Sequence, residues 1–209
     1  CLEQDSGFAA QVGNARRKLE DLQEKRAQLN AKTASMQASL SSNFAVNTII
    51  ENKRKFPGVH GTIAELGQVN KKYAPALETA AGGRMNNLVV DSDKTAAECI
   101  RFLKEKRAGS ASFVPLNKIK YREITAADKP LKKNLGVHDF ALNLISYPSK
   151  YKKAFAYVFG NTLVVDDLQA ARKVGIGRVK MSTLDGNIAE ASGVMRGGFK
   201  SRRSGVGFQ

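Results

Sequence analysis

The chain contains one sequence unit twice, and this repeat limits the folds that it can adopt. The run YAPALETAAG, which begins at Tyr73, recurs in part 78 positions later as YKKAFAYVFG from Tyr151. The run NNLVVD at residues 86–91 recurs after 75 positions as NTLVVD at residues 161–166. A third block, which begins at Gly109, recurs after 68 positions. Three blocks in the same order indicate a duplication and predict two similar subdomains related by a pseudo-twofold axis.

Each half is predicted to run helix, strand, helix, strand, so the expected class is mixed α and β. In the first half we expect a strand with a turn at 59–66, helices at 70–81 and 94–107, and strands at 87–90 and 112–115. In the second half we expect helices at 150–159 and 167–174, and strands at 162–165 and 178–183. The polar stretch 117–136 is expected to connect the halves and could hold an edge strand.

Before the repeat, apolar residues alternate at spacings of three and four, which is typical of a coiled coil. The positions are Val12, Ala15, Leu19, Leu22, Arg26, Leu29, Thr33, Met36 and Leu40. One interpretation is a coiled-coil arm that needs a partner helix, and the other is an amphipathic helix packed on a globular body. A second helix is expected at 43–55, ended by the proline that follows Phe56. The expected organisation is an arm at 1–43, subdomains at 44–125 and 126–199, and an outgoing arm or disordered tail at 200–209.

The charge of the chain favours an acidic partner. Lys and Arg number 34 against 19 Asp and Glu, which gives a formal charge of +15. Nucleic acid is the first candidate and an anionic membrane the second. No run of about 18 apolar residues and no secretory signal is present, so we expect no membrane span and a cytoplasmic location. Only Cys1 and Cys99 occur, without a CxxC pair, which argues against a disulfide framework or a zinc site. A chain that begins at Cys1 is also expected to be a fragment of a longer protein.

Two histidines and two aspartates are the candidates for chemistry. His60 and His138 lie near turn glycines without a partner at the spacing of a catalytic triad, so we interpret them as surface or structural residues. Asp91 and Asp166 each end a predicted strand, where a carboxylate can cap the next helix or bind a metal. We favour capping, and a metal between the two aspartates is the enzymatic alternative. The residues that could share the capping role are Ser92 and Asp167.

The C-terminal stretch GVMRGGFKS, from Gly193, resembles a phosphate-binding loop only in part. Phe199 separates the glycines from the lysine, and no apolar strand precedes the stretch, so we exclude nucleotide binding. The glycines of Ser192-Gly193 and Gly197-Gly198 favour either an edge strand that pairs with a second subunit or a flexible loop. Composition does not decide between these two.

Two basic clusters suit the phosphate backbone of a nucleic acid. They are Lys53, Arg54 and Lys55 after the arm, and Arg196, Lys200, Arg202 and Arg203 near the end. If the clusters meet, they form one DNA-binding patch, and otherwise they form a solvated charged face. The chain has no Trp and no array of stacking aromatics. Any nucleic-acid binding should therefore be weakly sequence-specific and strongly salt-dependent.

Six motifs occur in a recognisable order. They are FPGVHGTIAELG at 56–67, YAPALETAAGGR at 73–84, FVPLNKIK at 113–120, FGNTLVVD at 159–166, TLDG at 183–186 and SGVMRGG at 192–198. In this order they resemble the hinge domain of structural maintenance of chromosomes (SMC) proteins, of prokaryotic type, over residues 43–203. The resemblance implies a doughnut-shaped homodimer in which the first subdomain of one chain pairs with the second subdomain of the other.

The resemblance also implies roles for individual residues. The dimer interface is expected at Ser192, Gly193, Val194, Gly197 and Gly198, with Ser192 in place of a frequent glycine. DNA binding without sequence specificity is expected at the two basic clusters.

The family's ATPase heads, which bind ATP and Mg, belong to distant parts of the sequence, so no enzymatic activity, cofactor or metal is expected in this chain. Kleisin and accessory subunits are expected only for a full-length protein. The expected function is a dimerisation hinge for chromosome condensation and segregation at the nucleoid. The alternative is a stand-alone basic DNA-binding module.

Overall fold

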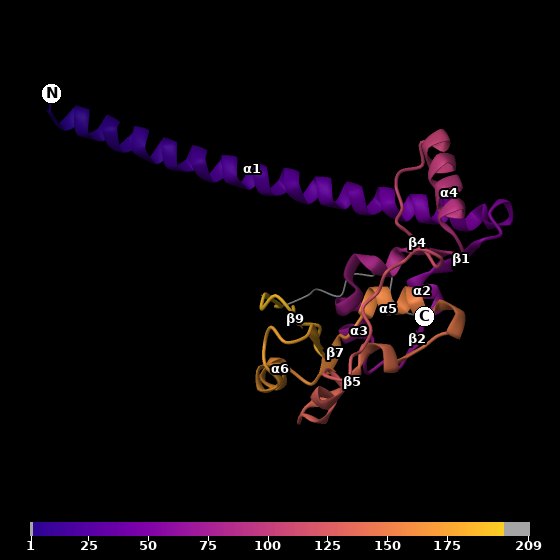
Figure 1. Cartoon of the computed structure of the whole chain (residues 1–209). Coiled ribbons are helices and arrows are strands. Elements are labelled where there is room, and N and C mark those ends of the chain that lie inside the picture. Colours follow the sequence, from indigo (N-terminus) through magenta and orange to yellow (C-terminus); the bar gives the residue numbers. More distant parts are fainter. Residues whose placement is uncertain (1, 199–209) are drawn as a thin grey trace.

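The computed structural model describes residues 2–198, which form a long helical arm attached to a mixed α and β body (Figure 1). The arm belongs to helix α1 (Leu2–Glu51), which continues into the body. Residues 14–51 contain neither glycine nor proline, so nothing in the sequence interrupts the helix over this length. The separate helix expected at 43–55 is therefore wrong. Its first part is the end of α1, and its last part is the short 3-10 helix η1 (Lys53–Lys55) just before Pro57.

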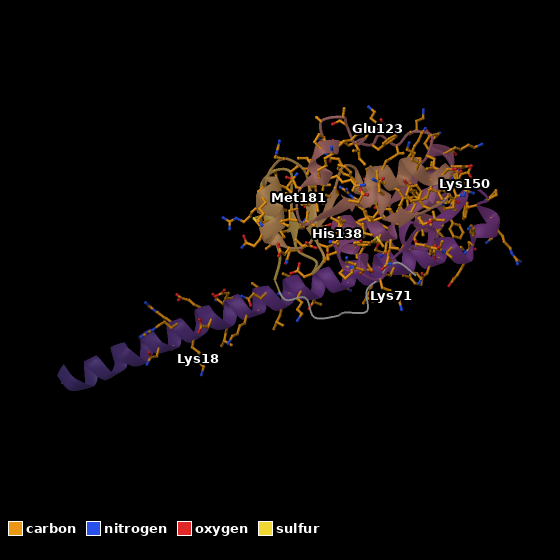
Figure 2. All side chains as sticks on the ribbon, turned by 90° about the horizontal axis from the view of Figure 1, so that it is seen from below. Lys18, Lys71, Glu123, His138, Lys150 and Met181 are labelled. Carbon is orange, nitrogen blue, oxygen red and sulfur yellow. The ribbon has the colours of Figure 1, made fainter. Side chains whose placement is uncertain are left out.

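The arm projects from the body rather than packing along it, as Lys18 shows in Figure 2. The leucines of the predicted heptad pattern whose side chains are described are 55–67% exposed, namely Leu19, Leu22, Leu29 and Leu40. The side chains of Val12 and Met36 lie outside the described part of the chain. Burial begins near residue 45, where Ala45, Val46 and Ile49 enter the core. An exposed row of leucines on a projecting helix favours the coiled-coil interpretation, because such a row needs a partner helix.

The first lobe contains a three-stranded sheet with the order β1-β3-β4. Its elements are β1 (Val59–Thr62), α2 (Ile63–Leu66), β2 (Gln68–Val69), α3 (Ala74–Ala81), η2 (Gly82–Asn86), β3 (Leu88–Val90), α4 (Asp93–Lys106) and β4 (Phe113–Pro115). Strand β1 pairs antiparallel with β3, and β4 pairs parallel with β3. One leucine and two valines make up β3, which is buried along its whole length as the central strand.

The second lobe repeats this plan and extends it by two strands, in the order β10-β9-β8-β7-β5. Its elements are η3 (Lys129–Lys133), β5 (Val137–Phe140), η4 (Ala141–Asn143), β6 (Ile145–Ser146), η5 (Ser149–Tyr151), α5 (Lys152–Phe159), β7 (Leu163–Val165), α6 (Leu168–Val174), β8 (Met181–Thr183), β9 (Ile188–Ala189) and β10 (Met195–Arg196). Strands β5, β7 and β8 pair in the same order and directions as β1, β3 and β4 of the first lobe. The predicted duplication into two similar lobes is thus confirmed by the fold.

The strand registers repeat as well. Val59 pairs with Val90 in the first lobe and Val137 pairs with Val165 in the second, and an irregularity follows the first residue of each strand. At the junction of the lobes, β2 pairs antiparallel with β6, with Gln68 opposite Ser146. This short pairing joins equivalent segments of the two lobes.

A central apolar cluster is shared by both lobes and is built around α3 and α5. Leu77 of α3 and Phe155 and Phe159 of α5 are almost fully buried there. Two outer clusters lie in the separate lobes, one around Ile49 and Leu88 and the other around residues of β7, β8 and α6. Burial of a large apolar side chain contributes about 1.5–3 kcal/mol. The shared cluster therefore holds the two lobes together as one body.

Two further expectations differ from the structure. The strand with a turn expected at 59–66 is strand β1 followed by a helix rather than a turn. The strand ends at Thr62, because the Thr62 hydroxyl accepts from the Glu65 amide while the Glu65 carboxylate accepts from the Thr62 amide. This capping box starts the one-turn helix α2. The connector 117–136 holds no strand. Its ordered element is η3, which begins at Lys129 and has Pro130 in its first turn.

Candidate interface and basic surfaces

Both histidines contact a tyrosine of the other lobe. The ring centroids of His60 and Tyr151 lie 5.2 Å apart at 60°, and those of Tyr73 and His138 lie 5.3 Å apart at 66°. Over each tyrosine ring lies the lysine that precedes it in the sequence. Lys150 Nζ is 4.9 Å from the ring centroid of Tyr151, and Lys72 Nζ is 5.4 Å from that of Tyr73. The two stacks are related by the repeat. Both histidines are thus structural residues of the junction between the lobes.

The aspartates at the strand ends have partners of their own. His138 Nε2 lies 2.7 Å from Asp166 Oδ1, and the Thr95 hydroxyl donates to Asp91 Oδ1 at 2.6 Å. That hydrogen bond lowers the pKa of the Asp91 carboxyl. Among the described residues, no three His, Cys, Asp or Glu side chains are grouped so that they could hold a metal ion.

Helix capping falls to the residues that follow the two aspartates. The Ser92 hydroxyl accepts from the Thr95 amide at the start of α4, and the Asp167 carboxylate accepts from the Ala170 amide at the start of α6. The expectation that Asp91 and Asp166 themselves act as N-caps is therefore wrong. The repeat places an N-cap at the same position in both lobes.

The five residues predicted for a dimer interface lie together on the β9–β10 hairpin and just after it. Gly193 forms the turn at φ +89°, in the left-handed region, and its amide donates to the Glu190 carbonyl at 2.9 Å. Strand β10 ends the sheet, and residues 191–198 are all exposed. Val194 and Met195 expose apolar side chains, 56% and 43% accessible. Met195 and Arg196 thus form an edge strand, and the pairing of this strand with a second subunit stays a prediction.

The glycines after β10 have different roles. A Cβ at Gly197 would overlap the side-chain amide of Asn187 in the same chain. The Gly198 amide donates to Asn187 Oδ1 at 3.1 Å, with φ +125° at Gly198. A Cβ at Gly198 would meet nothing within 4 Å. A larger residue at Gly197 would therefore displace the Asn187 side chain, which holds the Gly198 amide, whatever pairs with the strand.

The first lobe also ends in an open strand, β4. Its inner side bonds to β3, since Leu88 donates to the Ser112 carbonyl and Leu116 donates to the Val90 carbonyl. By the alternation of a strand, the backbone groups of Phe113 and Pro115 face outward. Proline at that position removes one donor, as is common at sheet edges.

The predicted basic residues are divided between distant places. Lys53, Arg54 and Lys55 form η1 at the end of α1, where Lys53 Nζ donates to the His60 carbonyl at 2.7 Å. Arg196 lies on β10 and donates to Glu190 Oε1 at 2.8 Å. Figure 1 shows η1 and the β9–β10 hairpin on opposite sides of the body, so their described members do not form one patch. The other predicted residues, Lys200, Arg202 and Arg203, lie outside the described residues.

No helix within residues 2–198 is both long enough and apolar enough to cross a membrane.

Known proteins share this sequence and this fold. Residues 56–175 match the family described as SMC proteins Flexible Hinge Domain. The chain is 43% identical over 209 residues to the chromosome partition protein Smc of Synechocystis sp. The matched region covers 99% of this chain but 17% of that protein. The SMC hinge domain of Geobacillus stearothermophilus, solved as an asymmetric dimer, matches with a TM-score of 0.72 and 28% identity over 84% of this chain and 77% of that one. The hinge domain of the Pyrococcus furiosus SMC protein matches with a TM-score of 0.67 and 33% identity over 83% of this chain and 90% of that one.

Proposed function

The chain belongs to the family of SMC flexible hinge domains, and on this premise we propose that it is the homodimerisation hinge of a chromosome partition protein. In this role it joins two coiled-coil arms and offers a basic surface to DNA in the cytoplasm, at the nucleoid. The chain spans 17% of the length of its curated relative. ATP and Mg, like kleisin and accessory subunits, would therefore bind other parts of a full-length protein.

An exposed apolar sheet edge is the observation that carries the dimer. Within residues 2–198, strand β10 is the last strand of its sheet, and Val194 and Met195 expose their side chains there. Soluble proteins usually protect such an edge, because it offers unpaired backbone groups together with apolar surface. In the proposed dimer, β10 of one chain pairs with β4 of the other. A twofold axis then produces this contact twice, because each chain contributes both edges.

The arm supports the second part of the role. The exposed leucines of α1 form an unpaired seam that a second helix would cover. The short basic helix η1 lies where this arm enters the body, so a DNA strand held there would lie at the junction of arm and hinge.

Sedimentation of the chain with a charge placed on the edge tests the dimer. We expect the parent chain to sediment with twice its 22.7 kDa mass, and M195D or V194D to sediment as a monomer with an unchanged circular dichroism spectrum. The matched control is L135D, because Leu135 is 82% exposed but lies in the turn before β5. Substitution of Gly197 is a poorer test, since it disturbs the hairpin itself. A parent chain that stays monomeric at high concentration would refute the proposal.

Salt separates this function from that of a stand-alone DNA-binding module. Binding to DNA should weaken steeply as salt rises, because it releases counterions. A dimer held by strand pairing and apolar contacts should change little over the same range. A dimer that dissociates in parallel with the loss of DNA would favour the module, with DNA as the bridge.

A further inference from the structure

A cavity of about 500 Å³ is lined by residues of both lobes and by none of η1. Its first-lobe wall is the C-terminal end of α3 with the Gly82-Gly83 turn. Its second-lobe wall comes from four residues, Tyr157, Lys180, Glu190 and Arg196. Three cationic side chains line it, Arg84, Lys180 and Arg196. Glu190 is the one acidic residue among the described residues of the lining.

The cations are fixed in place by contacts with both lobes. Lys180 Nζ donates to the Ala80 carbonyl at 2.8 Å and lies 4.0 Å from Glu190 Oε2. Arg196 donates to the other oxygen of Glu190 at 2.8 Å. The Arg84 guanidinium lies over the Tyr157 ring, 5.4 Å from its centroid, and has no ion pair with any described residue.

One carboxylate therefore serves two of the three cations, which leaves a net charge of +2 among these four side chains. Burial lowers the pKa of the Lys180 ammonium, and the positive charges of Arg84 and Arg196 lower it further against the opposing effect of Glu190. Burial and the two guanidinium charges thus disfavour the charged lysine, whereas Glu190 favours it. An anion inside the cavity would favour the charged form of Lys180, because its negative charge would lie close to all three cations.

We propose that this cavity between the lobes binds a phosphate group through Arg84, Lys180 and Arg196. A guanidinium matches two phosphate oxygens at once, and an ammonium adds a third charge-assisted hydrogen bond. Asn87, Ser112 and Tyr157 also line the cavity and bring further polar groups. The volume lies within the range of small-ligand sites and is ample for two linked phosphates. All three cations come from one chain, so the site is complete within a single chain, and Arg196 lies on β10, the strand that pairs with the partner in the proposed dimer.

Calorimetric titration of the 209-residue chain with pyrophosphate tests the site. We expect saturable binding with one pyrophosphate per chain. R84Q should weaken it about tenfold or more, since a hydrogen bond to a charged group is lost. K180M should do the same while keeping the apolar stem of the side chain. The matched control is K150Q, which also removes a positive charge from above a tyrosine ring but lies outside the cavity. Unchanged affinity in R84Q, or equal losses in R84Q and K150Q, would overturn the proposal.

Two sources could supply the phosphate, and competition distinguishes them. If a short single-stranded oligonucleotide displaces pyrophosphate, and if R84Q weakens both, the natural ligand is the backbone of a nucleic acid. If both bind together, the site takes a free phosphate compound. Displacement that R84Q leaves unaffected would contradict the site. Because Arg84 is exposed, R84Q should keep its fold and its mass in sedimentation, and so failure of this proposal can be told apart from failure of the dimer.

Discussion

The ring of Tyr73 in the first lobe packs edge-on against the ring of His138 in the second, with 5.3 Å between the centroids. The same contact occurs a second time with the lobes exchanged, because Tyr151 of the second lobe packs in the same way on His60 of the first. Each lobe thus supplies a tyrosine to the other and receives one in return. Together with the shared core around α3 and α5, these crossed contacts make the relative position of the lobes a property of the single chain.

We expect the crossed contacts to contribute to stability. An edge-to-face aromatic pair contributes about 0.5–1.5 kcal/mol beyond its buried area. Y73L keeps an apolar side chain but loses the pair, so urea unfolding should show a loss of about 1 kcal/mol. The control is Y121L, since the Tyr121 hydroxyl donates to the neighbouring Glu123 and the residue lies on the connector, away from the crossed contacts. That variant should change the free energy of unfolding by less than about 0.5 kcal/mol. Equal effects would contradict the role of the stack.

The crossed contact at His60 should make stability depend on pH. Burial lowers the pKa of His60 below its ordinary value, and the charges of Lys150 and Lys53 lower it further against Asp91. Below about pH 6.5 the unfolded chain therefore binds a proton that the folded chain resists, so stability falls as the pH drops through that region. The free energy of unfolding should fall less between pH 7.5 and 5.5 in H60Q than in the parent chain. An identical fall in both would exclude His60 as a cause.

Local signals in the sequence were sufficient for much of the fold. Buried β-branched runs predicted β3 and β7. The helices expected at 70–81 and 150–159 are α3 and α5, which begin a few residues later and end at the expected residue before a glycine. The six motifs led to the correct family and to its prokaryotic type, as the match to residues 56–175 and the bacterial relative confirm.

The remaining features depend on how the two lobes pack, which no local pattern encodes. His60 and His138 follow the sequence Gly-Val at the same 78-residue offset as the two tyrosines, so their equivalence was visible in the sequence. Their crossed contact was not, because it depends on the docking of α3 and α5. The cavity at Arg84 and Lys180 is a feature of the same kind, since residues about 100 positions apart form it.

We expect Ser92 rather than Asp91 to be the main cap of α4. Its hydroxyl accepts from the Thr95 amide, a contact that S92A removes. Loss of an N-cap costs about 1 kcal/mol, and chemical unfolding should show this decrease. S110A is the control, because Ser110 lies exposed in the loop before β4. If S110A destabilises the chain as much as S92A, the assignment of the cap is wrong.

The basic helix η1 should account for a measurable part of the salt dependence of DNA binding. Replacing Lys53, Arg54 and Lys55 by glutamine removes up to three phosphate contacts, so the slope of log K against log salt should fall by about 2 to 3 for duplex DNA. Fluorescence anisotropy of a labelled duplex at several salt concentrations measures that slope. The matched control replaces Lys129, Lys132 and Lys133 of η3 by glutamine, which removes three positive charges from the second lobe instead. A purely global effect of net charge would change both slopes equally, whereas contacts at the junction of arm and hinge change only the first. Equal slopes in the two triple variants would therefore exclude η1 as the DNA-binding surface.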